Sequence, residues 1–267
     1  MKKAMSIALM LSLLAVLPAA AGTVQWVKKV DNWRVGTVQP VDNLDEEISI
    51  FLDDFEGTQD PWTTNDLTGA GTMWHTDAFN AYNDGTSWWC GDPAVGGYNN
   101  HWLQYLESPS LDLSAAGTDL ALTFQMYLDC EAPGGEPAGY DGWDGANVWY
   151  STDGGTTWTV LPNPTPAYLS TSLYSFGDEF GMGQGIAGWN GSFPHVWTAV
   201  NFDLSAFAGE SDFMFRIAFC SDPAEATPES GYLGMFVDDV MVADGTTTYL
   251  ENDAEGTAAP SDLVPLQ

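Results

Sequence analysis

Carboxylates interrupt two strand-like stretches, one near each end of the sequence. The stretch "FLDDFEG" carries Asp53, Asp54 and Glu56, and "MFVDDVMV" carries Asp238 and Asp239. Acidic side chains within a strand repel one another and resist burial unless something neutralises them. Calcium binds about six to eight oxygen atoms, many of them from carboxylates. We therefore predict that these five residues supply ligands to a structural Ca²⁺ ion.

Because side chains alternate along a strand, at most three of these five acids would reach one ion through regular strands. Asp54 and Glu56 point to one side of their strand and Asp53 to the other, while Asp238 and Asp239 also split between faces. A β-bulge would bring in a further ligand. The alternative is that the acids protect edge strands from aggregation. We favour calcium because acids mark both terminal strands and the sequence has few bases to pair with them.

Three tryptophans stand in polar, glycine-rich surroundings rather than in alternating strands. Trp89, Trp143 and Trp189 each lie among Gly, Asn, Asp or Ser residues. Flat rings beside such polar groups can stack on sugar faces or on partner side chains. We expect at least one of the three to face solvent and to bind a ligand. The alternative is that all three pack under their own loops as small satellite clusters.

The sequence contains no recognisable set of catalytic residues. It contains neither an H-E-x-x-H nor a G-x-S-x-G motif. His75, His101 and His195 are scattered through loop-like contexts with no nucleophile nearby in the sequence. Pairs of carboxylates are abundant, but among 37 acids such pairs arise by chance. We therefore predict a protein without enzymatic activity.

The N-terminus predicts export. Residues 1–21 combine Lys2 and Lys3, one apolar run and a final Ala-Ala-Ala, which is typical of a cleaved signal peptide. A membrane helix is the alternative, but the run is short and ends in Pro18 and small residues. No later segment is apolar enough to span a bilayer. The mature protein is expected outside the cell or on its surface.

The composition is strongly acidic. The chain has 37 acidic and 6 basic residues, and such a surface repels nucleic acid and anionic lipid while it attracts cations. Hydrophobic residues make up 45% of the chain, which argues against disorder. Of Cys90, Cys130 and Cys220, two could form a disulfide after export, although the sequence does not indicate which. The odd count argues against a disulfide-built scaffold, and zinc is not expected.

Short apolar runs separated by Gly, Asn, Asp and Pro predict an all-β fold. Strands are expected at residues 47–55, 102–108, 120–129, 146–152, 157–161, 198–204, 212–220 and 235–243. Eight strands with long loops indicate a two-sheet antiparallel sandwich of the jelly-roll type, with its first and last strands adjacent. The domain is expected over residues 47–243, after a leader (22–46) and before a polar tail or linker (244–267).

The order of several motifs resembles a known family. These motifs are "DDFEG", "SWWCG", "LESPSLDLS", "LTFQMYLD", "YDGWDGANVWYSTDGGTTWTVL", "WTAVNFDLSAFAG", "FRIAFCSD" and "FVDDVMV". Over residues 47–243 the chain resembles the MAM-like jelly-roll domains of secreted bacterial proteins. These include the cleaved-adhesin (choice-of-anchor J) type and the accessory domain of immune inhibitor A-like metallopeptidases.

The resemblance implies a non-catalytic sandwich of the concanavalin or galactose-binding kind, linked to proteases, adhesins or cell-surface sorting. It also implies a calcium ion between the first and last strands, with Asp53, Asp54 and Glu56 matching one element and Asp238 and Asp239 the other. We expect a calcium-stabilised adhesion module that recognises an extracellular protein or glycan. The alternative is a structural module of a surface assembly, or a peptidase accessory domain, without a small ligand. A C-terminal sorting module, lost or separate, would follow the tail.

Overall fold

The structure, a computed structural model, describes residues 51–52, 61–83 and 85–252, and only the backbone of residues 51–52. These residues belong to one compact unit, residues 48–267. The predicted signal peptide and leader lie outside the described residues, as do Asp53, Asp54 and Glu56. Within the described part of the chain, no helix has both the length and the apolar character that a membrane span requires.

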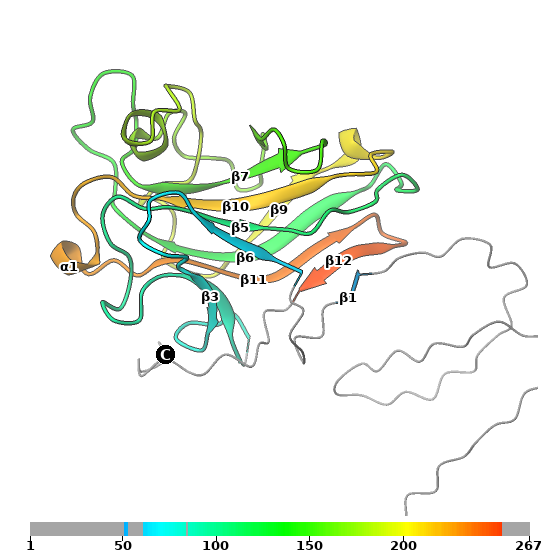
Figure 1. Ribbon diagram of the computed structural model, residues 1–267, viewed down its shortest axis with the longest axis horizontal. Helices are drawn as coiled ribbons and strands as arrows, with labels where there is room; N and C mark the ends of the chain where they lie inside the picture. The colour runs from blue at the N-terminus through cyan, green and yellow to red at the C-terminus, as the bar shows by residue number, and fades with distance from the viewer. Residues whose placement is uncertain (1–50, 53–60, 84, 253–267) are drawn as a thin grey trace, which may run out of the picture. The chain divides into compact units, whose positions relative to one another are not determined.

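The described strands form two sheets that pack face to face (Figure 1). They are β1 (Phe51–Leu52), β2 (Thr63–Asp66), β3 (Trp74–Asp77), β4 (Ser87–Cys90), β5 (Leu103–Glu107), β6 (Ala121–Asp129), β7 (Gly145–Ser151), β8 (Thr159–Val160), β9 (Thr198–Asp203), β10 (Met214–Cys220), β11 (Gly234–Ala243) and β12 (Thr248–Asn252). One sheet has the order β2-β5-β10-β7-β8, and the other contains the remaining strands around β11. The pairings between described strands are antiparallel except that of β1 with β12, which is parallel. The predicted two-sheet sandwich is confirmed.

Strand β6 shows how the sequence builds this core. Its burial alternates residue by residue, so Leu122, Phe124, Met126 and Leu128 are buried while their neighbours are partly exposed. Alternation of this kind is the signature of a strand with one face on the core. Complete burial of each such side chain contributes about 1.5–3 kcal/mol. The main core cluster draws its members from both sheets.

Strand β11 organises the larger sheet. Strand β6 pairs along one of its edges, while β4 and β12 share the other edge. Strand β4 pairs with Met235–Val237 and β12 with Val240–Ala243, so Asp238 and Asp239 occupy the junction between them. The pairing with β6 shifts register at the same point, and Asp239 has a φ of 51°. This irregularity is a β-bulge, and a bulge is the feature that would bring a further ligand to the predicted calcium ion.

The C-terminal boundary predicted at residue 243 is wrong. Residues 248–252 form β12, which pairs with β11, and Leu250 is fully buried. Strand β1 pairs with β12 rather than with β11, so β12 lies between the two strands expected to be adjacent. The folded unit therefore extends at least to Asn252. A short strand within a polar segment gave no alternation long enough to identify it.

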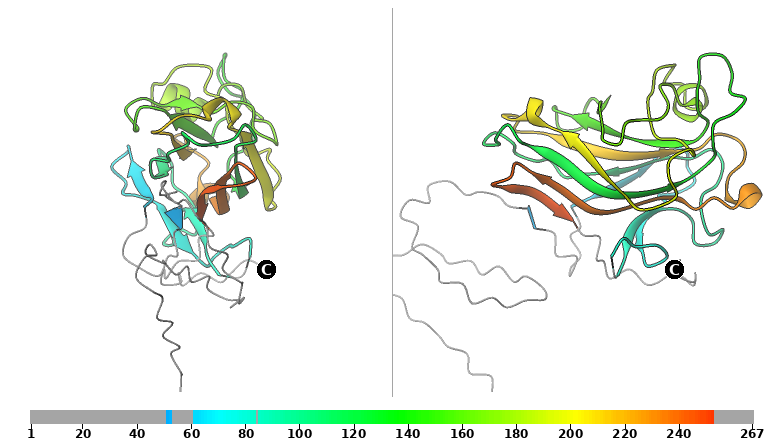
Figure 2. Two further views of the ribbon diagram at one scale, coloured as in Figure 1. Left: turned by 90° about the vertical axis from the view of Figure 1, so that its right-hand side faces the viewer. Right: turned by 180° about the vertical axis from the view of Figure 1, so that it is seen from behind.

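Long loops and short helices gather at one end of the sandwich. The β6–β7 loop, the π-helix η1 (Ser175–Glu179) and the helix α1 (Thr227–Ser230) lie there in the views of Figure 1 and Figure 2. The 3₁₀-helix η2 (Ser205–Phe207) follows β9. All three cysteines are buried and free, so no pair forms a disulfide.

Candidate functional site

Asp238 and Asp239 are the two predicted calcium ligands that the structure describes. Asp238 is 1% exposed. Its carboxylate accepts hydrogen bonds from the backbone N–H groups of Tyr82 (2.9 Å) and Asp239 (2.8 Å). The Asp239 carboxylate accepts one from Asn83 Nδ2 at 3.1 Å. These contacts hold the loop after β3 against the bulge in β11.

The residues present fit a cation at this bulge. A carboxylate has about four lone-pair positions, so N–H donors and a cation are compatible on the same group. Strand β1 runs parallel to β12, whose Asn252 pairs with Val240 beside the bulge. The described end of β1 at Leu52 is therefore directed toward the Asp238–Asp239 junction. Asp53 follows Leu52 directly in the sequence.

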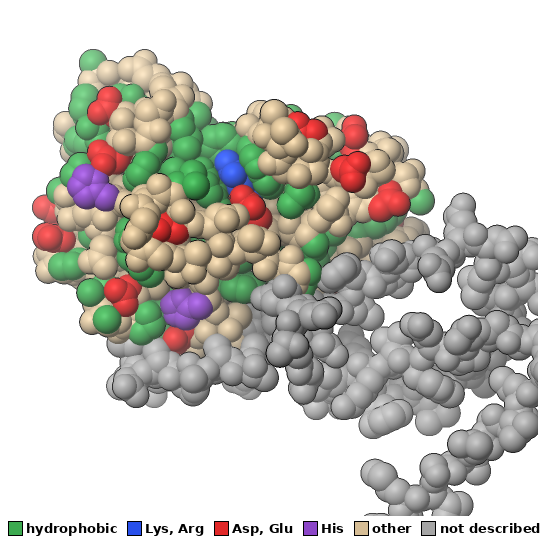
Figure 3. Space-filling model, viewed as in Figure 1, with side chains coloured by type: hydrophobic (Ala, Val, Ile, Leu, Met, Phe, Trp, Pro, Cys, Tyr) green, Lys and Arg blue, Asp and Glu red, His purple; other side chains and the backbone are tan. Residues whose placement is uncertain are grey.

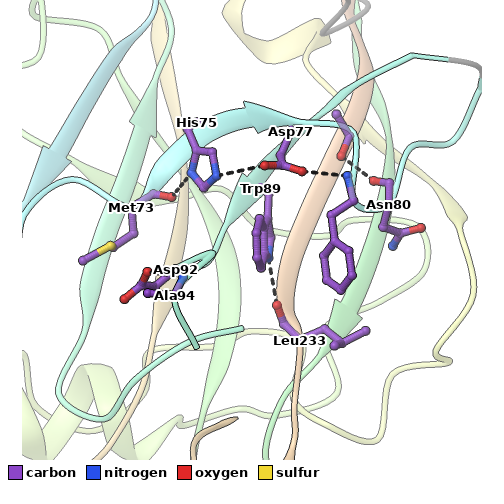
Figure 4. A network of polar contacts seen from close by, with 10 residues as sticks. Met73, His75, Asp77, Asn80, Trp89, Asp92, Ala94 and Leu233 are labelled. Atoms are coloured by element: carbon purple, nitrogen blue, oxygen red, sulfur yellow. Dashed lines mark hydrogen bonds and ion pairs between the residues drawn. The ribbon is translucent and has the colours of Figure 1, made fainter. Parts of the chain in front are cut away.

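Trp89 is not the solvent-facing ring that was expected among the three tryptophans. Trp89 is 0% exposed, and its Nε1 donates a hydrogen bond to the Leu233 carbonyl at 2.8 Å (Figure 4). Its ring stacks on Phe236 with centroids 5.4 Å apart and planes at 4°. Phe79 and Trp197 help to cover this outer face of the sheet. The polar-looking segment around Trp89 is a strand, β4, that is buried on both faces.

Trp189 does not face solvent either. This residue is also 0% exposed, and its Nε1 donates to the Pro166 carbonyl at 3.1 Å. The backbone of Trp189 bridges to Ala146, which directs the ring into the main core against Tyr168 and Phe202. Trp189 is therefore a core residue, although it lies in a segment rich in Gly and Asn.

Trp143 is the predicted binding tryptophan that remains partly exposed. Its Nε1 donates to the Gly134 carbonyl at 3.0 Å, which secures the β6–β7 loop. Its ring meets Tyr174 edge-on at 5.1 Å, and Tyr174 meets Tyr140 edge-on at 5.3 Å. All three side chains are partly exposed. We call Tyr140, Trp143 and Tyr174 the aromatic patch.

Carboxylates border the aromatic patch. Asp141 accepts hydrogen bonds from Thr171 N, Thr171 Oγ1 and Ser172 N at 2.7–3.0 Å. Partial burial works to raise its pKa, but these hydrogen bonds hold the pKa of Asp141 below its ordinary value. A hydrogen bond to Asp178 raises the pKa of the Tyr174 hydroxyl. Ordered acceptors therefore lie next to partly exposed rings.

A second group of acids was not predicted from the sequence. Glu131, Asp144 and Asp222 each place one carboxylate oxygen within 4.8 Å of the others, and we call them the acidic cluster. Asp144 is 0% exposed and Asp222 is also buried. Burial raises the pKa of both, and burial together with the Asp222 charge raises the pKa of Glu131 to about 7. In the sequence, all three lie within two residues of a strand end, the one signal that could have found them.

Arg216 is the sole Lys or Arg after residue 34, and its contacts are structural. Its guanidinium lies over the rings of Tyr105 (3.8 Å) and Trp158 (4.3 Å) and pairs with Glu107 at 3.3 Å. Elsewhere on the face shown in Figure 3, acidic side chains predominate over basic ones. This face thus shows the excess of acidic side chains that the composition predicts.

The strand order and the loop-end residues can be set beside known proteins. No family model matches the chain, and no curated protein sequence matches it. Similar solved structures include the K1 and K3 cleaved adhesin domains of Lys-gingipain from Porphyromonas gingivalis W83. The K1 domain is 18% identical with a TM-score of 0.39, over 70% of this chain and 93% of that one. The K3 domain is 15% identical with a TM-score of 0.33, over 68% and 91%.

A third similar structure is the glycoside hydrolase domain of Endo-D from Streptococcus pneumoniae R6. It is 17% identical with a TM-score of 0.36, and the match covers 70% of this chain but 22% of that one. At these identities and scores, none of the three similarities carries a conclusion about what this chain binds.

Proposed function

We propose that this chain is a secreted, non-catalytic, calcium-stabilised β-sandwich module that binds an extracellular protein or glycan. The observation that carries the proposal is the aromatic patch, in which Trp143, Tyr174 and Tyr140 stay partly exposed while Tyr174 contacts each of the other two rings edge to face. Burying such rings would stabilise the fold, so their exposure favours a role in contact with a partner.

The chemistry of the patch suits a sugar or a polar peptide surface. The ring faces supply apolar stacking area, and the carboxylates of Asp141 and Asp178 supply hydrogen-bond acceptors for hydroxyl or amide groups. The indole of Trp143 and the carboxylate of Asp141 also fasten the two loops that carry the patch. A surface held in this way loses little conformational entropy on binding.

Burial of the acidic cluster supports the non-catalytic part of the proposal. A glycosidase requires two carboxyl groups that flank a bound sugar. Asp144 is 0% exposed and its two oxygens accept hydrogen bonds from Tyr98 Oη and Asp222 N, both at 2.7 Å. A substrate could not reach this carboxylate without displacing these partners.

The bulge at Asp238 and Asp239 supports the calcium part of the proposal. A buried carboxylate and a left-handed residue interrupt β11 where β4 gives way to β12. Asp53, Asp54 and Glu56 would add ligands from the segment that follows β1. Calcium there would supply positive charge and oxygen coordination to acids that otherwise repel one another.

One observation favours the alternative, a structural or accessory module without a small ligand. Two of the three predicted binding tryptophans, Trp89 and Trp189, are fully buried. In that case the aromatic patch would contact a neighbouring domain of an assembly rather than a free ligand. Binding measurements on the isolated chain distinguish the two functions.

The test is a binding screen on a glycan array and on extracellular matrix proteins, followed by variants. Trp143→Ala should lower the affinity for a captured ligand at least tenfold while it changes the melting temperature little. Tyr82→Ala is the matched control, because Tyr82 is 43% exposed and its ring contacts Trp197 instead of the patch. If Trp143→Ala binds as tightly as Tyr82→Ala, the patch is not the binding surface.

A further inference from the structure

The outer face of the smaller sheet carries aromatic side chains around Arg216. Along β10, the neighbours Phe215 and Ile217 belong to the main core, so Arg216 between them points to the opposite face of the sheet. In the sheet register, Arg216 stands beside Trp149 on β7 and beside Glu107 on β5. The arginine therefore lies in the middle of this outer face.

The turn between β7 and β8 brings a further ring to the guanidinium. The Asp153 carboxylate accepts hydrogen bonds from Ser151 Oγ, Thr157 N and Thr157 Oγ1 at 2.7–2.8 Å, which fixes the turn. Trp158 follows directly, and its ring centroid lies 4.3 Å from Arg216 Cζ. We call the following four residues the arginine hollow: Tyr105, Trp149, Trp158 and Arg216.

The arginine hollow is open to solvent. Figure 3 shows Arg216 in blue, in a depression between two raised parts of the surface, and 13% of its side chain is exposed. In the same view, Figure 1 places the loops around η1 on one side and the turn after β7 on the other. Phe180 and Met182 from the first segment and Val160 from the second are partly buried against the same apolar cluster. The hollow thus combines apolar walls with one positive charge.

Hydrogen-bond donors in the arginine hollow lack acceptors. Of the five N–H donors of Arg216, the described residues engage one, through a 3.3 Å bond from Nη1 to Glu107. Arg216 Nε and the hydroxyl of Tyr105 are shielded from solvent and have no partner in the described chain. Burial raises the pKa of Tyr105 to about 12, so its hydroxyl keeps its proton at neutral pH. The other oxygen of Glu107 accepts from Asn65 Nδ2 at 2.7 Å, so this carboxylate is already shared.

We propose that the arginine hollow binds the carboxylate of an acidic sugar residue. A guanidinium pairs with a carboxylate through two parallel N–H···O bonds, and apolar surroundings strengthen such a pair. The partly exposed ring of Trp158 supplies a flat face for the sugar ring. The hollow shares no residue with the aromatic patch, so the inference adds a second site to the proposed function and does not depend on the first.

Charge complementarity selects this occupant. Arg216 is the sole Lys or Arg among the residues that the structure describes, and acids far outnumber bases in the chain. An anionic group is therefore repelled elsewhere on the surface and accommodated here. A single carboxylate on a rigid and otherwise uncharged ring suits one positive charge. An acidic peptide suits it less well, because the surrounding acids would repel its further charges.

The test measures binding of sialylated and uronic-acid-containing oligosaccharides, each beside its carboxyl methyl ester, on an array and then by calorimetry. At least one acidic oligosaccharide should bind, and its methyl ester, which lacks the charge, should bind at least tenfold more weakly. Arg216→Lys keeps the positive charge but loses the paired donors, and it should weaken binding at least tenfold. Trp158→Ala should do the same. Tyr82→Ala is the control, because Tyr82 is 43% exposed and its ring contacts Trp197, outside the hollow.

Several results would overturn the inference. Binding of no acidic oligosaccharide, or equal affinity for an acid and its methyl ester, would do so. So would an Arg216→Lys variant that is folded by circular dichroism and binds within twofold of the Tyr82→Ala control. If Arg216→Lys does not fold, Trp158→Ala takes its place in this comparison. A glutamate-rich peptide that binds as tightly as the sugar would overturn the assignment to a sugar.

A further variant separates this inference from the proposed function. Loss of acidic-sugar binding in Trp143→Ala but not in Trp158→Ala would place the sugar on the aromatic patch. That outcome would overturn the inference and support the proposed function. Loss in Trp158→Ala but not in Trp143→Ala would support the arginine hollow, whatever the aromatic patch binds.

Discussion

Asp244 forms several hydrogen bonds that hold together the chain segments just after β11. Its carboxylate accepts hydrogen bonds from the N–H groups of Gly117, Thr246 and Thr247 and from the Tyr249 hydroxyl, at 2.8–3.0 Å. These bonds, that from Gly117 first, lower its pKa well below the ordinary value of 3.8. The charged form of this one side chain therefore stabilises the turn that leads into β12.

Asp244→Asn should lower the stability of the protein in a pH-dependent way. The folded-state pKa is depressed, so the stabilisation is complete above the unfolded-state pKa near 4 and is lost as the pH falls through the folded-state value. The difference in melting temperature between the original chain and Asp244→Asn should thus be constant from pH 8 to 6 and shrink below pH 4. A difference that stays the same down to pH 3 would contradict this assignment.

The burial and the neighbours of individual side chains were harder to predict from the sequence than the positions of the strands. The strand acids Asp238 and Asp239 stood out because apolar residues surround them. By contrast, Glu131 and Asp144 are two among 37 acids, and only the fold shows that they converge. Trp89 and Trp143 have similarly polar neighbours, yet tertiary packing buries the first and leaves the second partly exposed.

Strand β12 should be essential to the fold. A chain that ends after Ala243 loses the burial of Tyr249 and Leu250, at about 1.5–3 kcal/mol for each side chain, together with the pairing along β11. We expect its free energy of unfolding to fall by at least about 3 kcal/mol relative to a chain that ends after Asn252, as measured by urea denaturation. Equal midpoints for the two chains would show that β12 contributes little.

The strands that the sequence revealed are those with long alternation or strong apolar runs. Strands β6, β10 and β11 lie within two residues of their predicted bounds. Strands β2 and β3 were not predicted because they are short and contain Asp, Asn, Thr or His. Only their pairing with β5 and β4 identifies them. Strand β4 was not predicted because a strand that is buried on both faces shows no alternation of apolar and polar residues.

For the whole molecule, calcium should raise stability beyond the effect of salt. Binding to the folded state alone contributes about 2.7 kcal/mol at a hundredfold excess over Kd. A chain with a net charge of −31 also gains from any cation that screens repulsion, so sodium chloride of equal ionic strength is the reference. We expect calcium to raise the melting temperature above both that reference and a chelator. Glu56→Ala with Asp238→Ala should reduce the increase, and an unchanged response would count against the Asp238 site.

The reactivity of the three buried thiols can report how often the structure around each of them opens. Cys90 belongs to one sheet and Cys220 to the other, while Cys130 follows β6, and burial raises the pKa of each thiol well above 9.0. Protonated and enclosed, none should react with an alkylating reagent until its surroundings separate. Mass spectrometry after timed labelling would therefore compare how often each layer opens. If the sandwich opens as one cooperative unit, Cys90 and Cys220 should be alkylated at the same rate. Faster alkylation of Cys130 would indicate that the loop end opens more often than the two sheets.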